Sequence, residues 1–268
     1  MRSVRDDLGG VAELPDGPVG RVVSLVPSLT EALAATRPSA LVGATDWCTQ
    51  PPDLEAPRVR GTKNPDRSAV AALRPDLVVC VQEENRELDV QRLRSAGIPV
   101  WVGVVESVED ALRVLRRLLV DVLRWGAPDW LVQVERRWAG PPTTSSGAGR
   151  PPGRPRVAVP IWRDPWMVVG PRTFTTDLLA RAGLDNVYAA GTERYPRVEL
   201  TELDAAGADV ALLPDEPYVF THDDGPEAFA RTPTRLVSGR LLTWYGPAML
   251  EAADLLQELA GGRGPQAR

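Results

Sequence analysis

Two continuous apolar runs, each preceded by an aspartate and followed by paired acids, place the strongest constraint on how this chain folds. The stretch from Asp76 to Arg86 reads Leu-Val-Val-Cys-Val after the aspartate and then Gln-Glu-Glu-Asn-Arg. The stretch from Asp209 to Phe220 reads Val-Ala-Leu-Leu and then Pro-Asp-Glu-Pro-Tyr. Such short, uninterrupted apolar runs are typical of strands buried on both faces of a parallel sheet that helices cover. Ligands bind beyond the carboxyl ends of these strands, so both acidic pairs are predicted at a ligand site.

Strand signals alternate with helix signals in both halves of the chain, which predicts an α/β fold with two lobes and parallel sheets. We expect strands at residues 21–26, 41–45, 76–81, 100–104, 156–161 and 210–213, and helices at 87–96, 107–125, 129–138, 174–182 and 247–259. The predicted domains are a flexible N-terminal arm (1–19), an N-lobe (20–126), a linker helix with a Pro/Gly-rich loop (127–155), a C-lobe (156–262) and a disordered tail (263–268). The arm is inferred from its polar, Gly-, Pro- and Asp-rich composition.

Charge and cysteine content limit the partners and the cellular compartment that we expect for this protein. A net charge of −5 and a pI near 5.2 disfavour a nucleic-acid partner, whose receptor would carry a basic face. No apolar stretch reaches membrane-spanning length, so no membrane insertion is expected. Cys48 and Cys80 are too few for a disulfide framework and are expected to be buried thiols. The first residues lack the apolar core of a secretion signal, and no lipid-anchoring cysteine follows, so we expect a cytoplasmic protein.

The start of the first helix carries a local motif. Ser28 and Glu31 have the spacing of a capping box, in which hydroxyl and carboxylate satisfy reciprocal backbone amides. That role is structural. The alternative is that the amides at this helix N-terminus face an anionic ligand.

The loops that follow the predicted strands gather aromatic rings, arginines and carboxylates. Rings stack on flat ligands, arginine binds carboxylate or phosphate through two hydrogen bonds, and acids accept hydrogen bonds from amides or amines. This mixture suits a large, flat or ringed ligand with polar edges. The candidate ligand-binding residues are Trp47, Lys63, Asn64, Glu83, Glu84, Arg86, Arg163, Trp166, Arg194, Tyr195, Glu216, Tyr218, Trp244 and Tyr245.

Signals for catalysis are weak. The chain has no Walker loop, no dinucleotide-binding glycine motif and no nucleophile elbow, so we expect no nucleotide cofactor. The single histidine, His222, could form a small metal site with Asp223 and Asp224 but not a histidine-rich cluster, and we predict no metal site and no catalytic residue. The pairs 83–84 and 215–216 could do acid–base work if burial separated their pKa values, which leaves an enzyme as an alternative.

A series of motifs runs through both predicted lobes in a fixed order. The N-lobe motifs are residues 21–31 (Arg-Val-Val-Ser-Leu-Val-Pro-Ser-Leu-Thr-Glu), 41–43, 51–52, 73–78 and 93–100, and the C-lobe motifs are 170, 177–179, 183, 186–187, 195–196 and 208–210. Their order resembles the class III substrate-binding proteins, the helical-backbone metal receptors of cobalamin, haem and siderophore importers. The likeness covers nearly all of residues 21–260. It is greatest to the cobalamin-binding type, and in particular to a signal-less cytosolic branch that shares 62–65, 82–86, 161–167, 193–196 and 244–247.

The resemblance implies two Rossmann-like lobes with parallel sheets, joined by a backbone helix, with the ligand cleft between the lobes. Cobalamin-type receptors stack aromatic side chains on the corrin ring. By position, such contacts map to Trp47 or Gln50, Tyr195 and Trp244. The implied ligand is therefore cobalamin or another metal chelate.

Receptors of this type also dock on an ABC permease through one acidic residue per lobe. Glu87 matches the first of these residues, and the second match falls on Thr201 with Glu202 beside it. The favoured interpretation is a non-catalytic cytosolic receptor for a corrinoid or similar metal chelate. The alternatives are an enzyme of specialised metabolism built on the binding-protein fold, and a secreted importer subunit whose partner is the permease.

Overall fold

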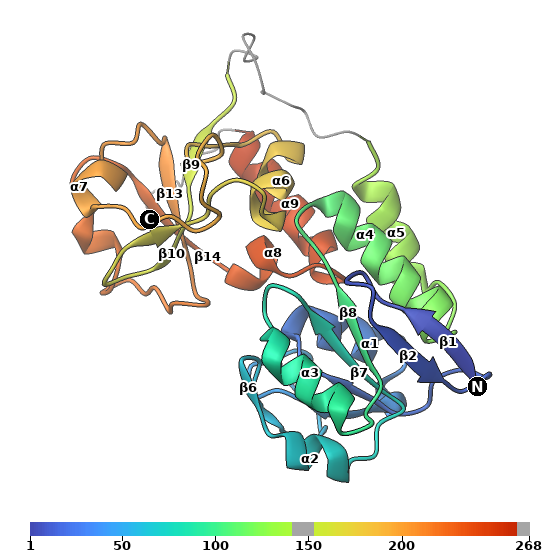
Figure 1. The fold of residues 1–268 in the computed structure, drawn as a ribbon. Coiled ribbons are helices and arrows are strands. Elements are labelled where there is room, and N and C mark those ends of the chain that lie inside the picture. Colours follow the sequence, from blue (N-terminus) through green and yellow to red (C-terminus); the bar gives the residue numbers. More distant parts are fainter. Residues whose placement is uncertain (141–152, 262–268) are drawn as a thin grey trace. The chain divides into compact units, whose positions relative to one another are not determined.

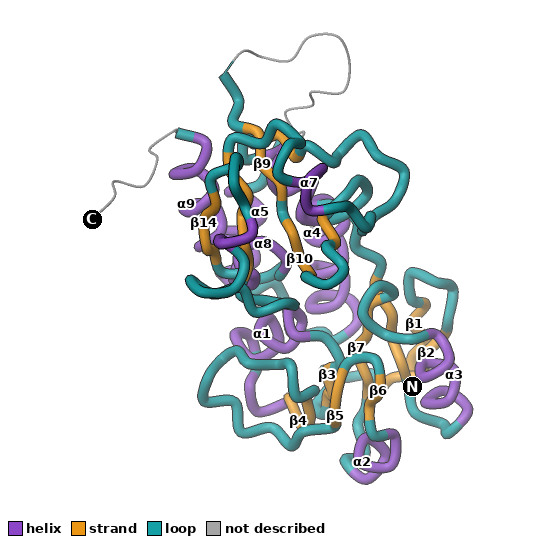
Figure 2. The backbone as a smooth tube through the Cα atoms, turned by 90° about the vertical axis from the view of Figure 1, so that its left-hand side faces the viewer, coloured by secondary structure: helices purple, strands orange, loops and turns teal. Residues whose placement is uncertain are grey.

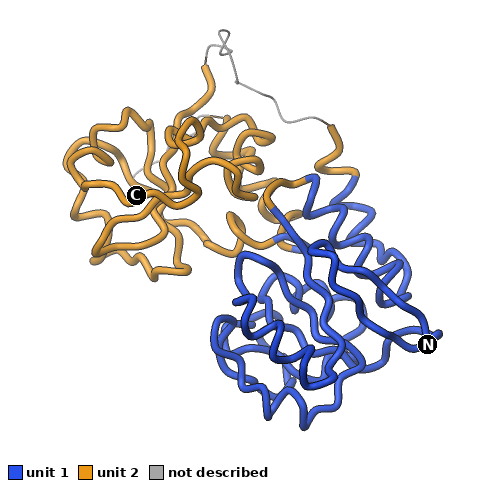
Figure 3. The backbone as a smooth tube through the Cα atoms, viewed as in Figure 1, with its two compact units in different colours: residues 1–105, 109–135, 245–247 blue, residues 106–108, 136–244, 248–268 orange. Residues whose placement is uncertain are grey.

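The computed structural model describes residues 1–140 and 153–261, and within them the chain divides into two compact units (Figure 3). Unit 1 comprises residues 1–105, 109–135 and 245–247. Unit 2 comprises residues 106–108 together with the described parts of 136–244 and 248–268. Most of the predicted Pro/Gly-rich loop, at 141–152, and the predicted tail lie outside the described residues.

Unit 1 is built on a parallel four-stranded sheet (Figure 1). Its strands are β3 (Val22–Ser24), β4 (Leu41–Ala44), β7 (Leu77–Val81) and β8 (Val100–Gly103), in the order β4-β3-β7-β8. All five residues of β7 are buried, so the prediction of a strand covered on both faces is confirmed. A strand in that position needs apolar side chains on both of its sides, which is why the run is uninterrupted.

Helices cover the two faces of this sheet. On one face, Val78 and Cys80 pack in a core with residues of α2 (Arg67–Ala72) and α3 (Glu87–Ser95). On the other face, Gly103 allows close packing, because a Cβ atom there would lie 3.0 Å from the side chain of Val114 in α4 (Val108–Arg116). The sheet is also packed by α1 (Pro27–Thr36), which contacts β3 and β4.

The remaining elements of this half are short. A 3₁₀ turn (Pro38–Ala40) precedes β4, and the antiparallel hairpin β5 (Arg60–Gly61) and β6 (Asn64–Pro65) precedes α2 (Figure 2). Helix α4 continues into a π-helical segment (Arg117–Val122), and α5 (Asp129–Arg137) follows. The helix predicted at 107–125 is thus present as an α-helical part and a π-helical part.

Residues 1–19, predicted as a flexible arm, contain a β-hairpin instead. Strands β1 (Arg2–Arg5) and β2 (Val11–Leu14) pair antiparallel over four residue pairs. Ala12 and Leu14 are buried, at 3% and 0% exposure, and so is Val19 after the hairpin. The segment therefore contributes apolar side chains to the core of unit 1 despite its polar composition.

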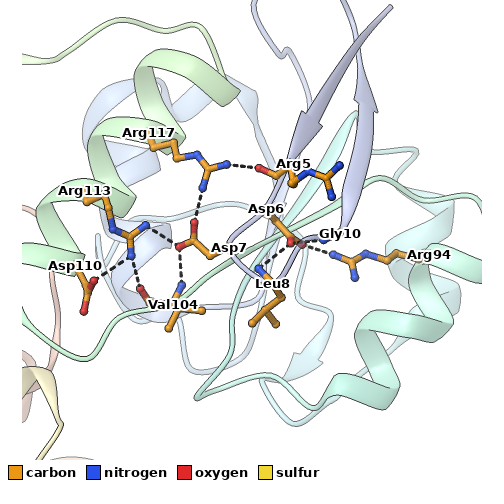
Figure 4. A network of polar contacts seen from close by, with 10 residues as sticks. All are labelled: Arg5, Asp6, Asp7, Leu8, Gly10, Arg94, Val104, Asp110, Arg113 and Arg117. Atoms are coloured by element: carbon orange, nitrogen blue, oxygen red, sulfur yellow. Dashed lines mark hydrogen bonds and ion pairs between the residues drawn. The ribbon is translucent and has the colours of Figure 1, made fainter.

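Two acids hold this hairpin in place (Figure 4). Asp6 forms an ion pair with Arg94, and the carboxylate of Asp7 accepts hydrogen bonds from Arg113 and Arg117. Composition alone cannot reveal these partners, because they lie about a hundred residues further along the chain. The prediction of a loose arm was wrong for that reason.

Unit 2 has a second parallel four-stranded sheet. Its strands are β9 (Arg156–Ala158), β12 (Asp185–Asn186), β13 (Val210–Pro214) and β14 (Thr234–Val237), in the order β12-β9-β13-β14. A small antiparallel pair, β10 (Pro160–Trp162) with β11 (Met167–Val168), follows β9. The helices are α6 (Phe174–Arg181), α7 (Leu200–Leu203), α8 (Gly239–Thr243) and α9 (Ala248–Ala260), with a 3₁₀ turn at Pro226–Ala228.

The two sheets share one strand order, the first strand lying between the second and the third. Each third strand is preceded by an aspartate that holds the start of the first strand. Asp76 accepts the amide hydrogens of Gly20 (3.0 Å) and Arg21 (2.8 Å), and Asp209 accepts that of Arg156 (2.7 Å). These aspartates are structural, and the parallel strands bring all their carboxyl ends to the opposite edge of each sheet.

Helix α1 begins two residues earlier than the capping-box prediction requires. Val26 is the N-cap and Pro27 occupies the first helical turn, where its fixed φ and missing N–H cost nothing. Ser28 therefore lies inside the helix, where it is buried. The capping-box prediction was wrong. Among the described residues, no helix combines the length and apolarity that crossing a bilayer would require.

Candidate functional site

An open cavity of about 460 Å³ lies in unit 1, beyond the carboxyl end of β4. It is lined by Asp46, Trp47, Arg60, Gly61 and Asn64. The indole of Trp47 is 65% exposed, so its ring face is available for stacking on a ligand. The structure thus brings together two candidates from the sequence, Trp47 and Asn64, at the sheet edge where parallel sheets bind their ligands.

The loop that presents Trp47 is held by polar contacts beneath it. The guanidinium of Arg58 donates hydrogen bonds to the carbonyl oxygens of Thr45 (3.0 Å) and Cys48 (2.8 Å). The thiol of Cys48 lies between the hydroxyls of Thr30 (3.0 Å) and Thr45 (3.1 Å). Burial raises the pKa of this thiol, so it stays protonated and acts as a small packing group rather than a nucleophile.

The facing wall of the cavity is the β5–β6 hairpin. Gly61 leaves space there for two side chains, since a Cβ atom would lie 2.4 Å from Oδ1 of Asn64 and 3.3 Å from Nε1 of Trp47. Arg60 has a φ of 68°, in the left-handed region that arginine seldom adopts. Lys63, the single lysine of the chain, is exposed in the hairpin turn. The hairpin therefore carries two cationic side chains, of which Arg60 lines the cavity with Trp47 and lies 3.7 Å from the carboxylate of Asp66.

The acidic stretch after β7 contains side chains of different exposure. Glu83 and Arg86 are exposed, Glu84 is half-buried, and Asn85 is buried at 7%. The candidates Glu83, Glu84 and Arg86 thus lie at the same sheet edge as the cavity. Asn85 instead points into the unit.

Trp244 and Tyr245 do not offer their rings to solvent. They are 6% and 5% exposed. Burial raises the pKa of Tyr245 well above its ordinary value, and the nearby charge of Glu84 raises it further. Both were candidate ligand contacts, and the structure places both among packed residues.

In unit 2, the loop that carries Arg194 and Tyr195 rests on Gly170. The amide of Gly170 donates to the carbonyl of Arg194 at 2.8 Å, and a Cβ atom on Gly170 would lie 2.3 Å from the carbonyl oxygen of Glu193. Arg194 pairs with Glu106 at 3.0 Å, and its guanidinium lies 6.0 Å from the ring centre of Tyr195. Tyr195 is half-buried, so part of its ring remains accessible.

Arg163 is held between two acids instead of facing solvent. Its guanidinium pairs with Asp224 and Glu227 and lies 5.6 Å from the ring centre of Trp166. Trp166 is 7% exposed and stacks on Phe220 with ring centres 5.8 Å apart. Arg163 and Trp166 therefore stabilise the loop through these contacts. They do not present a surface to a ligand.

A partly exposed aromatic pair, Trp162 and Tyr218, lies beside these residues. The rings of Trp162 and Tyr218 meet edge to face at 5.7 Å, and Trp162 is 44% exposed. The hydroxyl of Tyr218 donates to Asp224, and this hydrogen bond raises the pKa of Tyr218. Tyr218 is thus fixed in position with its ring beside the exposed indole.

The acids after β13 have structural contacts. Asp215 accepts the amide hydrogen of Gly239 at 2.7 Å, at the start of α8. Glu216 packs against the same glycine, because a Cβ atom on Gly239 would lie 2.4 Å from Cγ of Glu216. Both positions are therefore set by the turn into α8, which weakens the case for acid–base catalysis by this pair.

Metal ligands do not gather anywhere in residues 1–140 and 153–261: no group of three His, Cys, Asp or Glu side chains there could hold an ion. His222 lies exposed in its loop. The candidate docking acids are both exposed, Glu87 at the start of α3 and Glu202 in α7. Glu87 accepts a hydrogen bond from Gln91 at 2.8 Å.

Three residues that shape the site were missed by the sequence reasoning: Arg58, Arg60 and Asn85. Arginine in a loop and asparagine in a polar run are ordinary surface residues by composition. The roles of Arg58 and Asn85 depend on backbone carbonyls that the fold brings near them, and that of Arg60 depends on its place in the cavity lining. The only sequence signal was their place in the loops that follow predicted strands.

Comparison with known proteins supports the resemblance. No family model matches the chain. The vitamin B12-binding protein of Salmonella paratyphi A is 28% identical over 188 residues, which is 66% of this chain and 66% of that protein. The chain thus matches slightly less than two thirds of the length of this relative.

Solved structures agree on the architecture. The periplasmic vitamin B12-binding protein BtuF of Vibrio cholerae has a TM-score of 0.69 at 16% identity, covering 92% of this chain and 99% of that one. The periplasmic haem-binding protein BhuT, solved with two haems, has a TM-score of 0.71 at 25% identity, covering 89% and 96%. The predicted fold class, two α/β lobes with parallel sheets, is confirmed.

Proposed function

Because the chain is homologous to vitamin B12-binding proteins and has the fold of the class III periplasmic binding proteins, we propose that it binds a tetrapyrrole-like metal chelate, a corrinoid in the first place. It holds this ligand without changing it chemically. The observation that carries the proposal is the indole of Trp47, exposed over a cavity at the ligand edge of the unit 1 sheet.

The chemistry of the unit 1 sheet edge fits such a ligand. A corrin or porphyrin has a broad apolar face and polar groups around its rim. Trp47 in unit 1 offers ring surface for the face. Arg60 and Lys63 offer donors for acidic or amide groups of the rim.

Titration of the purified protein tests this function. Cyanocobalamin and haemin are added separately, and tryptophan fluorescence and the ligand's visible absorbance are followed together. We expect saturable quenching, with the absorbance change at the same midpoint. Absence of saturation by either compound at micromolar concentration would contradict the proposal. A native mass spectrum of protein taken from its own host then identifies the retained ligand.

We also propose that an ABC permease is the partner if the protein works outside the cytosol. The acids Glu87 and Glu202 would make the contacts, since each is exposed on a helix of its own unit. Charge reversal at both positions should abolish co-purification with the permease while ligand titration stays unchanged. Retained co-purification would count against these residues.

A further inference from the structure

Asn85 is a buried amide within an exposed, charged stretch. Its neighbours at positions 83, 86 and 87 are exposed, whereas Asn85 itself is 7% exposed. A buried side-chain amide is costly unless its donors and acceptor are satisfied. Its contacts therefore indicate what it does.

The side chain of Asn85 joins three segments. Its Oδ1 accepts the amide hydrogen of Val81, the last residue of β7, at 2.9 Å. Its Nδ2 donates to the carbonyl of Leu25, just after β3, at 3.1 Å, and to the carbonyl of Thr62, in the β5–β6 turn, at 3.0 Å. Both amide hydrogens are thus used. No other residue type of this size offers two donors and an acceptor in one plane.

The hairpin that Asn85 holds cannot define its own position. Strands β5 and β6 have two residues each, too few for a stable isolated hairpin. Its base is fixed by backbone hydrogen bonds from Asp46 to Arg60 (2.9 Å) and from Asp66 to Val59 (2.8 Å). Its turn is fixed through Thr62.

The same hairpin forms one wall of the cavity beneath Trp47, through Arg60, Gly61 and Asn64. We propose that Asn85 is a positioning residue for ligand binding, which sets this wall at the distance from Trp47 that the ligand requires. This inference rests on the proposed binding function. Asn85 itself need not touch the ligand.

The test compares Asn85→Ala with Asp76→Ala. Both residues flank β7, but Asp76 holds its amino end, away from the cavity. Hydrogen exchange is measured by mass spectrometry on the peptide covering residues 58–66, without ligand. We expect faster exchange there in Asn85→Ala, and wild-type exchange there in Asp76→Ala. Unchanged exchange in Asn85→Ala would overturn the positioning role.

Affinity for cyanocobalamin and haemin is then measured for the same proteins at a temperature where all are folded. We expect Asn85→Ala to bind the ligand that the wild type binds about tenfold more weakly than the wild type does. The reason is that a cavity wall displaced by roughly 1 Å no longer fits the ligand closely. Asp76→Ala should bind both ligands with wild-type affinity, even if its melting temperature falls as far as that of Asn85→Ala. Wild-type affinity in Asn85→Ala despite a loosened hairpin would refute the inference. If the wild-type protein binds neither probe, the proposed function fails, and the exchange measurement still decides whether Asn85 positions the hairpin.

Discussion

The carboxylate of Asp7, in the N-terminal hairpin, lies 3.0 Å from the guanidinium of Arg113 on α4. The same carboxylate binds Arg117 and accepts the amide hydrogen of Val104 at 3.0 Å, and its side chain is only 7% exposed (Figure 4). Asp7 therefore attaches the hairpin both to the end of β8 and to α4. It behaves as part of unit 1.

Replacing Asp7 by alanine should lower the free energy of unfolding by about 1–3 kcal/mol, because hydrogen bonds to a charged, buried acceptor are lost. Urea denaturation measures the change. Asp16→Ala is the control: this acid pairs with the terminal ammonium at 2.7 Å, but its side chain is 76% exposed. We expect no measurable effect there. Equal stability of Asp7→Ala and the wild type would show that the hairpin is not anchored through this residue.

Gly170 should not tolerate a side chain. In Gly170→Ala the new methyl group would meet the Glu193 carbonyl oxygen at 2.3 Å, so the loop carrying Arg194 and Tyr195 must move. We expect a stability loss of roughly 1–3 kcal/mol, as for other overpacked sites. Gly191→Ala is the matched control, because its nearest contact would be an ordinary 3.4 Å. A Gly170→Ala protein as stable as that control would contradict the close packing.

The stability contributed by Asp204 should depend on pH. Desolvation alone would raise its pKa, but the backbone amides of Thr232, Ala230 and Arg231 donate to its carboxylate and hold the pKa below its ordinary value. A carboxyl whose pKa is lower in the folded state stabilises the fold above the unfolded-state pKa, near 4, and loses that contribution as the pH falls through the folded value.

Asp204→Asn should therefore be less stable than the wild type at pH 7, by on the order of 1 kcal/mol, because solvent screens part of the charge's contribution at this half-buried site. The difference should shrink steadily below about pH 4. Thermal unfolding of both proteins across the acid range provides the measurement. A difference that stays constant at all pH values would mean that the charge of Asp204 contributes nothing.

Trp47 should contribute ring stacking to ligand binding and little to stability. Its side chain is 65% exposed, so Trp47→Ala should unfold like the wild type. We expect its affinity for cyanocobalamin or haemin to fall roughly five- to thirtyfold, the equivalent of about 1–2 kcal/mol. Trp47→Phe, which keeps a ring, should recover part of the loss. An alanine variant with full affinity would place the ligand elsewhere.

The compartment is a prediction that cell fractionation decides. A protein produced from its native gene with a C-terminal epitope should appear in the cytosolic fraction if the expectation from the sequence is right. Recovery from the cell envelope or the medium would instead favour the importer interpretation. The docking test on Glu87 and Glu202 would then become the decisive one.

Several elements could be predicted because their signal is local. The buried strand β7 is a continuous apolar run. Helix α3 ends at Ser95, one residue before the predicted end, and Gly97 follows with a φ of 77°. The hairpin at the N-terminus could not be predicted in this way. Its stability depends on Arg94, Arg113 and Arg117, which lie too far along the chain to be recognised from the sequence of residues 1–19.

The same distinction between local signals and tertiary contacts applies to the candidate site. Aromatic and charged residues after the strands could be identified, since parallel strands must end at one sheet edge. Their individual roles could not. Trp47 and Trp166 look alike in sequence, yet one is 65% exposed over a cavity and the other is 7% exposed beneath Arg163. The difference arises from packing partners such as Phe220, which lies far along the chain.

The amino-acid sequence by itself determined the α/β class, the buried central strands and the edge of each sheet at which functional residues gather. Periodicity and apolar runs are enough for that, because the free energy of burial acts on local patterns. The tertiary structure alone decided which rings face solvent, that Asp7 anchors a hairpin, and that Asn85 holds the wall of a cavity. Those outcomes depend on hydrogen bonds and ion pairs between residues as far as 110 positions apart, which form only once the chain has folded.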